Sequence, residues 1–171
     1  MKTLPSLLFA LIAGVLLAAP LSAEEENESV TITWSNTDKY RDVRSTTGGP
    51  IHELKQFKPA IEREVQKYVK RQFPEGTQLT MDIVDVVLAG RVDFARAQEI
   101  RVIKSIYPPA MTFSFTLSDA EGNVLAEDDK KRISDVGFLF GHQNPVHRDR
   151  YEYETEMVRD WLRSLKRETK I

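Results

Sequence analysis

The stretch that decides the fold is MTFSFTLS, residues 111–118. Its apolar residues are Met111, Phe113, Phe115 and Leu117, and each of them is followed by a serine or a threonine. Successive side chains of a strand point to opposite faces, so this period of two predicts a strand with one face in the core and one polar face.

The residues that follow predict a hairpin. Residues 119–123 (DAEGN) have turn chemistry, and residues 124–133 return as the partner strand. Residues 128–132 (DDKKR) carry mixed charges, which suit a sheet edge that must resist aggregation. An exposed edge can also accept a strand from another protein, so we expect residues 124–133 to bind a partner protein by β-strand addition.

Three further segments are predicted as strands. They are residues 30–34, residues 77–89 and the short segment 100–106. The second alternates as far as Ile83 and then becomes continuously apolar, which indicates either a β-bulge or burial on both faces. Residues 90–98 are polar and are predicted as a loop or a short helical turn.

Two segments have the apolar period of a helix. In residues 51–73 the apolar stripe is interrupted by Pro59, which predicts either a kink or a helix that starts late. In residues 149–170 the stripe is wide, and it includes Tyr153, Met157, Val158, Trp161, Leu162 and Leu165. Trp161 and Trp34 lie on the apolar phase of their segments, so they are predicted as core residues rather than as platforms for sugars.

The predicted order of elements is β-α-β-(β)-β-β-α. It defines an α+β fold, a two-layer sandwich in which a mostly antiparallel sheet of four to five strands carries two helices on one face.

The N-terminus has the three parts of a secretory signal. Lys2 supplies the positive charge, residues 7–19 form an uncharged run of 13 residues, and Ala23 offers a small residue for cleavage. The run is shorter than the roughly 20 apolar residues that span a bilayer. We therefore expect residues 1–23 to be removed and residues 24–171 to form a single periplasmic α+β domain without a stable membrane anchor, beginning with a flexible acidic tail (24–29). The alternatives are an uncleaved anchor or a core helix.

Composition argues against nucleic-acid binding and lipid anchoring. The 171 residues contain 24 Lys and Arg against 26 Asp and Glu, and loss of Lys2 leaves 23 against 26, a formal charge of −3. The two signs are interleaved, whereas nucleic-acid binders usually gather a basic face. The chain has no cysteine, which suits an oxidising compartment and excludes the N-terminal cysteine that a bacterial lipoprotein requires.

The histidines do not predict a metal site. His142, His147 and Asp149 lie in one loop, but Pro145 separates the two histidines and their spacing lacks the helical arrangement of zinc motifs. They are predicted as solvated loop residues. The third histidine, His52, lies in the segment 51–73. We predict no metal, cofactor or catalytic residue.

Asp82 and Asp85 stand in an otherwise apolar strand. Because they are three residues apart, they are expected on opposite faces unless a bulge re-aims one of them. Asp82 is then predicted to face solvent and Asp85 to accept structural hydrogen bonds, so the two do not form a catalytic pair.

The chain resembles a family of small exported proteins of Gram-negative bacteria that is catalogued as a domain of unknown function. The residues that carry the resemblance are Trp34 with 40–44 (YRDVR), 85–90 (DVVLAG), 101–103 (RVI), Pro108 and Pro109, 119–127 (DAEGNVLAE), and Asp160 with Trp161. The resemblance implies a periplasmic location and a single α+β domain. The family often has a second aspartate where this sequence has Val87, which weakens a metal or paired-carboxylate interpretation of that motif.

We expect a non-catalytic periplasmic protein that binds another envelope component. The candidate binding surface comprises Tyr40, Arg41, Asp42, Arg44, Asp85, Arg101, Tyr107 and Asp135. One alternative is a hydrolase-like or metal-assisted enzyme that uses Asp85 with Arg101 or the loop histidines. Another is a carrier of a small ligand, with a pocket formed by a sheet face and residues 107–109. The oligomeric state and the strand order stay open at this point.

Overall fold

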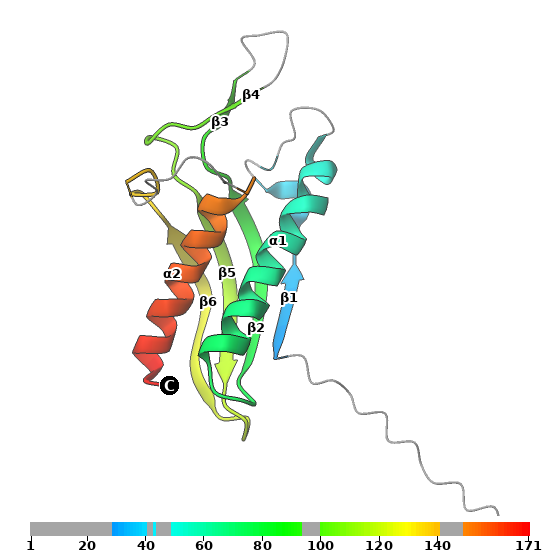
Figure 1. Cartoon of the computed structure of the whole chain (residues 1–171). Coiled ribbons are helices and arrows are strands. Elements are labelled where there is room, and N and C mark those ends of the chain that lie inside the picture. Colours follow the sequence, from blue (N-terminus) through cyan, green and yellow to red (C-terminus); the bar gives the residue numbers. More distant parts are fainter. Residues whose placement is uncertain (1–28, 41–42, 44–48, 94–99, 141–148) are drawn as a thin grey trace, which may run out of the picture.

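The fold has two layers, a sheet and a pair of helices, in the computed structural model of the chain (Figure 1). The structure describes residues 29–40, 43, 49–93, 100–140 and 149–171. Within them the elements are β1 (Val30–Trp34), the short 3-10 helix η1 (Thr37–Lys39), α1 (Gly49–Gln72), β2 (Gln78–Val87), β3 (Arg91–Asp93), β4 (Ile100–Val102), β5 (Ala110–Ser118), β6 (Val124–Ser134) and α2 (Glu152–Thr169). The predicted α+β class is confirmed, and the predicted elements occur in the expected order with one strand, β3, in addition.

The strand order of the larger sheet explains its mixed character. Among the described residues its four strands are ordered β1-β2-β5-β6. β1 runs parallel to β2, whereas β2 with β5 and β5 with β6 are antiparallel. A parallel pair needs a long crossover connection, and α1 lies in the connection between β1 and β2. Both helices cover the same face of this sheet, as predicted (Figure 1).

The alternating strand β5 forms the centre of the core. All four of its predicted apolar side chains are buried. The ring centroids of Phe113 and Phe115 lie 4.7 Å and 5.2 Å from that of Trp161 on α2. Trp34 is partly buried and packs edge-on against Phe57 of α1, with 5.8 Å between the ring centroids. Both tryptophans therefore belong to the core, as their phase in the sequence predicted.

The turn between β5 and β6 has the expected chemistry. The Asp119 carboxylate accepts hydrogen bonds from the side-chain amide of Asn123 and from the backbone N–H groups of Asn123 and Glu121. These donors, the Asn123 side chain first, lower the pKa of Asp119. The aspartate thus fixes the turn that joins the hairpin.

β2 contains the β-bulge that its sequence indicated. Its register with β5 shifts between Ile83 and Asp85, so that Asp82 lies opposite Ser114 and Asp85 lies opposite Thr112. Ser114 and Thr112 are two residues apart on β5 and share a face, and directly opposite residues of an antiparallel pair also share a face. Asp82 and Asp85 therefore both point to the face opposite the helices. The expectation that they point to opposite faces is wrong, because the extra residue of the bulge re-aims one of them.

The helix α1 does not start late at Pro59. It begins ten residues earlier, at Gly49, and continues through the proline. Pro59 is exposed, so its ring removes one backbone hydrogen bond on the solvent side without displacing the buried side chains.

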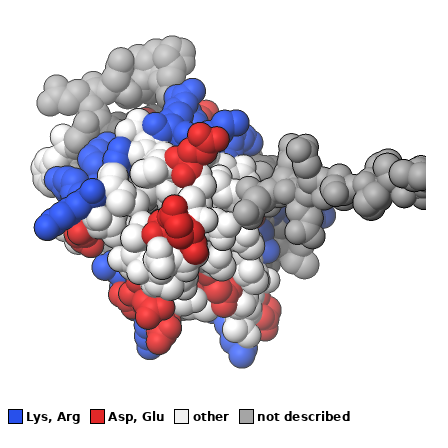
Figure 2. All heavy atoms as spheres, turned by 90° about the horizontal axis from the view of Figure 1, so that it is seen from below, with Lys and Arg blue, Asp and Glu red and all other residues white. Residues whose placement is uncertain are grey.

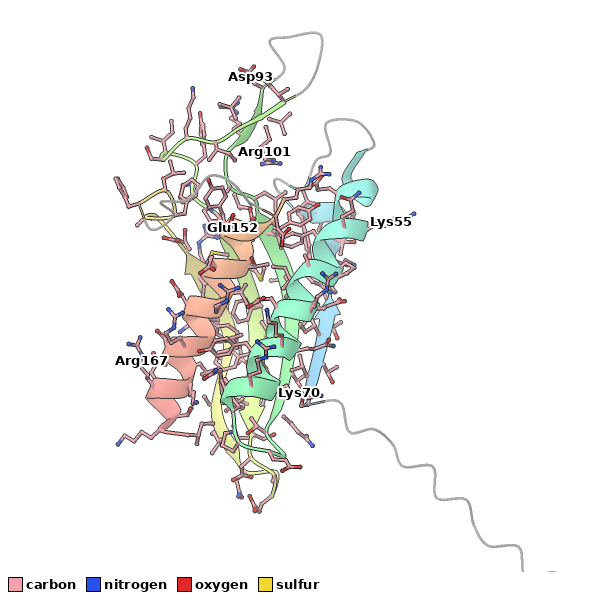
Figure 3. The ribbon with its side chains drawn as sticks, in the orientation of Figure 1. Lys55, Lys70, Asp93, Arg101, Glu152 and Arg167 are labelled. Carbon is pink, nitrogen blue, oxygen red and sulfur yellow. The ribbon has the colours of Figure 1, made fainter. Side chains whose placement is uncertain are left out.

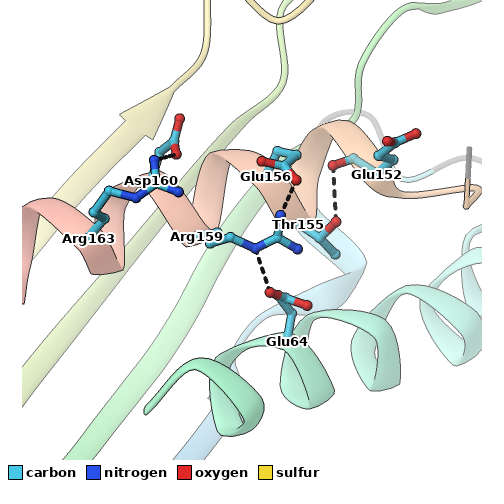
Figure 4. Close-up of polar contacts among 7 residues, drawn as sticks. All are labelled: Glu64, Glu152, Thr155, Glu156, Arg159, Asp160 and Arg163. Carbon is cyan, nitrogen blue, oxygen red and sulfur yellow. Dashed lines mark hydrogen bonds and ion pairs between the residues drawn. The ribbon is translucent and has the colours of Figure 1, made fainter. Parts of the chain in front are cut away.

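The helix α2 buries the whole stripe that its sequence predicted. Its polar side is tied to α1 through Arg159, which Figure 4 shows between the two helices. The Arg159 Nε donates to Glu64 of α1 over 2.7 Å, and its Nη1 donates to Glu156 of α2. A single guanidinium thus links the helices outside the apolar core.

Residues 91–93 form a strand, which corrects the prediction of a loop or helical turn from residue 90. β3 pairs antiparallel with β4, and Arg91 lies opposite Val102. The strand predicted over 100–106 is shorter and ends at Val102. Gly90 permits this pairing because its φ is +80° and because a Cβ there would lie 2.5 Å from the carbonyl oxygen of Val102. Neither the pairing with β4 nor the close approach at Gly90 can be predicted from a short polar segment.

Charges of both signs are interspersed on the surface. Seen from below, acidic and basic side chains alternate over the lower end of the molecule (Figure 2). The mixed charge pattern of the sequence therefore persists on this face of the fold.

The predicted signal and acidic tail lie almost entirely outside the described residues, which begin at Ser29. Among the described residues, no helix combines the length and the apolar character needed to cross a membrane.

Candidate functional site

A cavity of about 370 Å³ opens where both helices begin and where β2 ends. Its walls come from α1, from the residues after β2, from β4 and from the first turn of α2. The lining residues are Glu53, Leu88, Ala89, Arg101, Ile103, Asp149, Arg150, Tyr151, Tyr153 and Glu154. Five of these residues are charged, and the other five are apolar or aromatic.

Glu154 places a buried carboxyl group in this cavity. The residue is 2% exposed and lies in the first turn of α2. Its Oε1 accepts a hydrogen bond of 2.7 Å from the backbone N–H of Ala89. Burial raises the pKa of Glu154, and the charge on Glu53 raises it further, while the Ala89 hydrogen bond and the charge of Arg101 oppose the change. The carboxyl therefore holds a proton more readily than an exposed glutamate does.

Glu53 is a second buried carboxyl group of the same cavity, and it is fully engaged. Its Oε2 forms an ion pair of 2.7 Å with Arg150, and its Oε1 accepts a hydrogen bond of 2.8 Å from the Tyr151 hydroxyl. Burial, and then the hydrogen bond to Glu53, raise the pKa of Tyr151. The tyrosine therefore stays protonated and acts as a donor, so these three side chains fix the start of α1 against the start of α2.

Arg101 forms the wall of the cavity opposite the helices. Figure 3 shows it between the two-stranded sheet and the ends of the helices. Its Nη1 lies 3.5 Å and 3.4 Å from the carbonyl oxygens of Ala89 and Gly90. The guanidinium thus lies over the turn between β2 and β3, and its charge acts on Glu154.

An aromatic pair supports the side of the cavity. The ring of Tyr153 meets that of Phe138 edge-on, with 4.9 Å between the centroids. With Ala89 they form a small buried cluster apart from the main core. The cavity therefore has a wall of its own, which is independent of the packing between β5 and α2.

The chemistry available in the cavity is that of carboxyl, guanidinium and phenol groups. Among the described residues that line it there is no serine, threonine, cysteine or histidine. Nor does any group of three or more His, Asp or Glu side chains within the described parts of the chain have a metal-binding arrangement.

The residues predicted from the sequence lie in several places. Arg101 lines the cavity just described, whereas Asp85 lies in a hollow with Lys130 and Arg132 of β6. Tyr107 lines a smaller cavity beside β3 and β4, and Asp135 lies in a hollow between β6 and α2. The structure therefore does not bring Asp85 and Arg101 into one cavity.

Tyr40 packs against β2, within reach of the charges of Asp82 and Asp85. Its hydroxyl donates to the carbonyl oxygen of Ile83 over 2.6 Å. Burial raises the pKa of Tyr40, and the charges of Asp82 and Asp85 add to the effect. Asp82 is half-buried, and its Oδ1 is inaccessible and has no hydrogen-bond partner among the described residues.

The remaining predicted residues cannot be placed. Arg41, Asp42, Arg44, His142 and His147 lie outside the described residues, and the same holds for the side chain of His52.

The two buried glutamates were not among the residues predicted from the sequence, although each carried a signal. Glu53 lies four residues before Phe57, and Glu154 lies four residues before Val158, so each stands on the apolar stripe of its helix. A charged residue on a buried stripe indicates a paired or functional group, because charged side chains are rarely buried otherwise.

The fold and the cavity define a small α+β domain with buried carboxyl groups at one end of a two-layer sandwich. The chain belongs to the family described as "Protein of unknown function (DUF3016)", whose model matches residues 28–164. No curated protein and no solved structure matches the chain.

Proposed function

We propose that this chain is an exported, non-catalytic binding protein of the periplasm, and that the cavity lined by Glu154 holds its ligand. The location is supported by the signal-like order of residues 1–23 and by the absence of cysteine from the sequence. Binding is supported by the cavity itself, which combines apolar and aromatic side chains with charged ones.

The observation that carries the proposal is the Glu154 carboxyl group. It is almost fully buried, and among the described residues it has no ion-pair partner. A buried carboxylate without a cation in contact is costly, and its raised pKa expresses that cost. A ligand that brings a cation to this carboxyl would stabilise its ionised form.

The ligand class that fits is a small amphipathic amine. Its ammonium group would approach Glu154, while its apolar part would contact Leu88, Ile103 and Tyr153 on the walls. Glu53 is already paired with Arg150 and Tyr151, so it contributes negative potential rather than a free acceptor. Binding of the amine would then favour the ionised form of Glu154 over the protonated form.

Calorimetry tests this function. Primary amines of increasing apolar size, and alcohols of the same shape, would be titrated into the protein in two buffers of different ionisation enthalpy. As the pH is lowered toward the titration range of Glu154, we expect the amines to bind with decreasing affinity and with a growing release of protons. We expect little binding of the alcohols at any pH. The variant Glu154→Gln should lose the amine selectivity, whereas Asp160→Asn, at an exposed carboxylate of the same helix, should bind as the wild type does. Equal amine binding by Glu154→Gln and the wild type would refute the proposal.

Strand addition at residues 124–133 is a second proposal, and the edge position of β6 favours it. Replacing Leu125 or Glu127 with proline would remove a backbone donor from β6. Proteins that bind the wild type would be captured and compared with those that bind each proline variant. If both variants retain every partner in full, strand addition at β6 is refuted.

A further inference from the structure

β6 is an exposed edge of the larger sheet. β5 pairs with one side of it, and no described strand pairs with the other. The charged residues of β6 are largely exposed, and among the described residues none of them forms an ion pair within the chain. They are Glu127, Asp128, Asp129, Lys130, Lys131 and Arg132, three acidic residues followed by three basic ones.

A β-bulge lies at the centre of this charged segment. Lys131 is opposite Phe113 and Asp128 is opposite Phe115, so Asp129 and Lys130 together face Ser114. Phe113 and Phe115 point to the helices, and therefore Lys131 and Asp128 lie on the helix side of β6.

The bulge also decides the face of the outer charges. Glu127 and Arg132 are five residues apart, so in a regular strand they would point to opposite faces. Asp129 and Lys130 both lie on the side of β6 that faces away from the helices, which we call the open face. Because the bulge adds one residue, Glu127 and Arg132 also lie on the open face, where both are exposed.

We propose that β6 pairs antiparallel with β6 of a second copy of this chain, with Glu127 opposite Arg132, Asp128 opposite Lys131 and Asp129 opposite Lys130. In this register every acidic residue meets a basic one on the same face of the sheet. Opposite charges directly across an antiparallel pair are stabilising, whereas like charges are destabilising. The same register places Ala126 opposite Ile133 on the helix side, so the apolar flanks also match.

The arrangement is self-complementary, as a two-fold interface requires. Each protomer would offer the same six-residue segment, and the two sheets would form one continuous sheet of eight strands, twice the four of each copy. This inference rests on strand addition at β6 and is independent of the ligand in the cavity.

Charge reversal tests the partner. An acidic variant would carry Lys130→Glu, Lys131→Glu and Arg132→Glu, and a basic variant would carry Glu127→Lys, Asp128→Lys and Asp129→Lys. We expect the wild type to sediment as a dimer that weakens with added salt, each variant alone to be monomeric, and the 1:1 mixture of the two variants to dimerise. The control Lys55→Glu/Arg63→Glu/Lys67→Glu, on exposed positions of α1, changes the net charge as the acidic variant does and should remain dimeric.

Cysteine pairing tests the register even if a charge variant folds poorly. The chain has no cysteine, so disulfides can form only at introduced positions. Glu127→Cys mixed with Arg132→Cys should give an oxidised covalent dimer, whereas either variant alone should not. A monomeric wild type, a dimer that withstands both charge reversals, or cross-linking of Glu127→Cys to itself would each overturn the proposal. If the proline variants lose a captured protein other than this chain and the charge variants retain it, strand addition at β6 would be supported. The second copy would then be refuted as the partner.

Discussion

The Glu154 carboxylate accepts a hydrogen bond from the backbone N–H of Ala89, a residue 65 positions earlier in the chain, over 2.7 Å. This contact joins the first turn of α2 to the segment that follows β2. It orients a buried acid in the cavity and at the same time satisfies a buried backbone donor. The site and the fold therefore share one interaction.

Replacing Glu154 separates these two roles. Glu154→Ala leaves the Ala89 N–H without its acceptor, and we expect a loss of about 1–3 kcal/mol in the free energy of unfolding. Glu154→Gln keeps an acceptor oxygen and should cost less. Urea unfolding of the three proteins measures the difference, and equal stability of Glu154→Ala and the wild type would mean that the contact contributes nothing.

The pH dependence of stability should report the same carboxyl group. Its pKa is raised in the folded protein, so the folded state binds the proton more tightly than the unfolded state does. Stability therefore falls as the pH rises from the ordinary glutamate range through the higher folded-state value. Glu154→Gln has no such proton, so its stability relative to the wild type should increase over this interval. Unfolding curves at a series of pH values for both proteins test the sign, and a constant difference would contradict it.

Arg159 should stabilise the contact between the helices. It bridges Glu64 and Glu156, and the Glu64 side chain is only 14% exposed. We expect Arg159→Ala to cost about 1.5–3 kcal/mol, the range of hydrogen bonds to charged groups. Arg163→Ala breaks an exposed pair with Asp160 and should cost less than about 0.5 kcal/mol. A double-mutant cycle between Arg159 and Glu64 measures the coupling, which should vanish if the bridge does not form in solution.

Gly90 should tolerate a side chain poorly. Gly90→Ala imposes a positive φ on alanine and drives its Cβ into the Val102 carbonyl oxygen, so β4 and Arg101 must move. Gly122 has a similar φ of +85° but has open space around it, and Gly122→Ala isolates the cost of backbone strain, about 1 kcal/mol. We expect a larger loss of stability for Gly90→Ala, and a weaker ligand affinity in this variant alone. Equal effects of the two substitutions would argue against close packing at Gly90.

Local periodicity was sufficient to predict most of the fold. The alternation of β5 and the stripe of α2 both matched the buried faces, because each element packs one face against the same core. The break after Ile83 correctly indicated a bulge. The prediction for residues 91–93 failed because a short polar segment becomes a strand only by pairing with β4. The sequence of the segment itself does not show that pairing.

The candidate site was much less accessible from the sequence. Of the residues that form the cavity, only Arg101 was predicted. Glu53 and Glu154 are distant in the chain and approach each other only because both helices begin at the same end of the sheet. Their proximity follows from topology, whereas their shared position on apolar stripes was a local signal that could have been used.

The parallel pairing of β1 with β2 has a consequence for the order of assembly. Val30 lies opposite Leu79 and Trp34 lies opposite Ile83, so the first strand has no neighbour until the crossover and residues 79–83 of β2 are in place. The hairpin of β5 and β6 needs only its own short turn, and near contacts form sooner than remote ones. Pulse-labelling hydrogen exchange during refolding should protect the amides of 110–134 before those of 30–34, whereas simultaneous protection would indicate a concerted sheet. The N-terminal strand β1 would thus be the last strand to join the sheet.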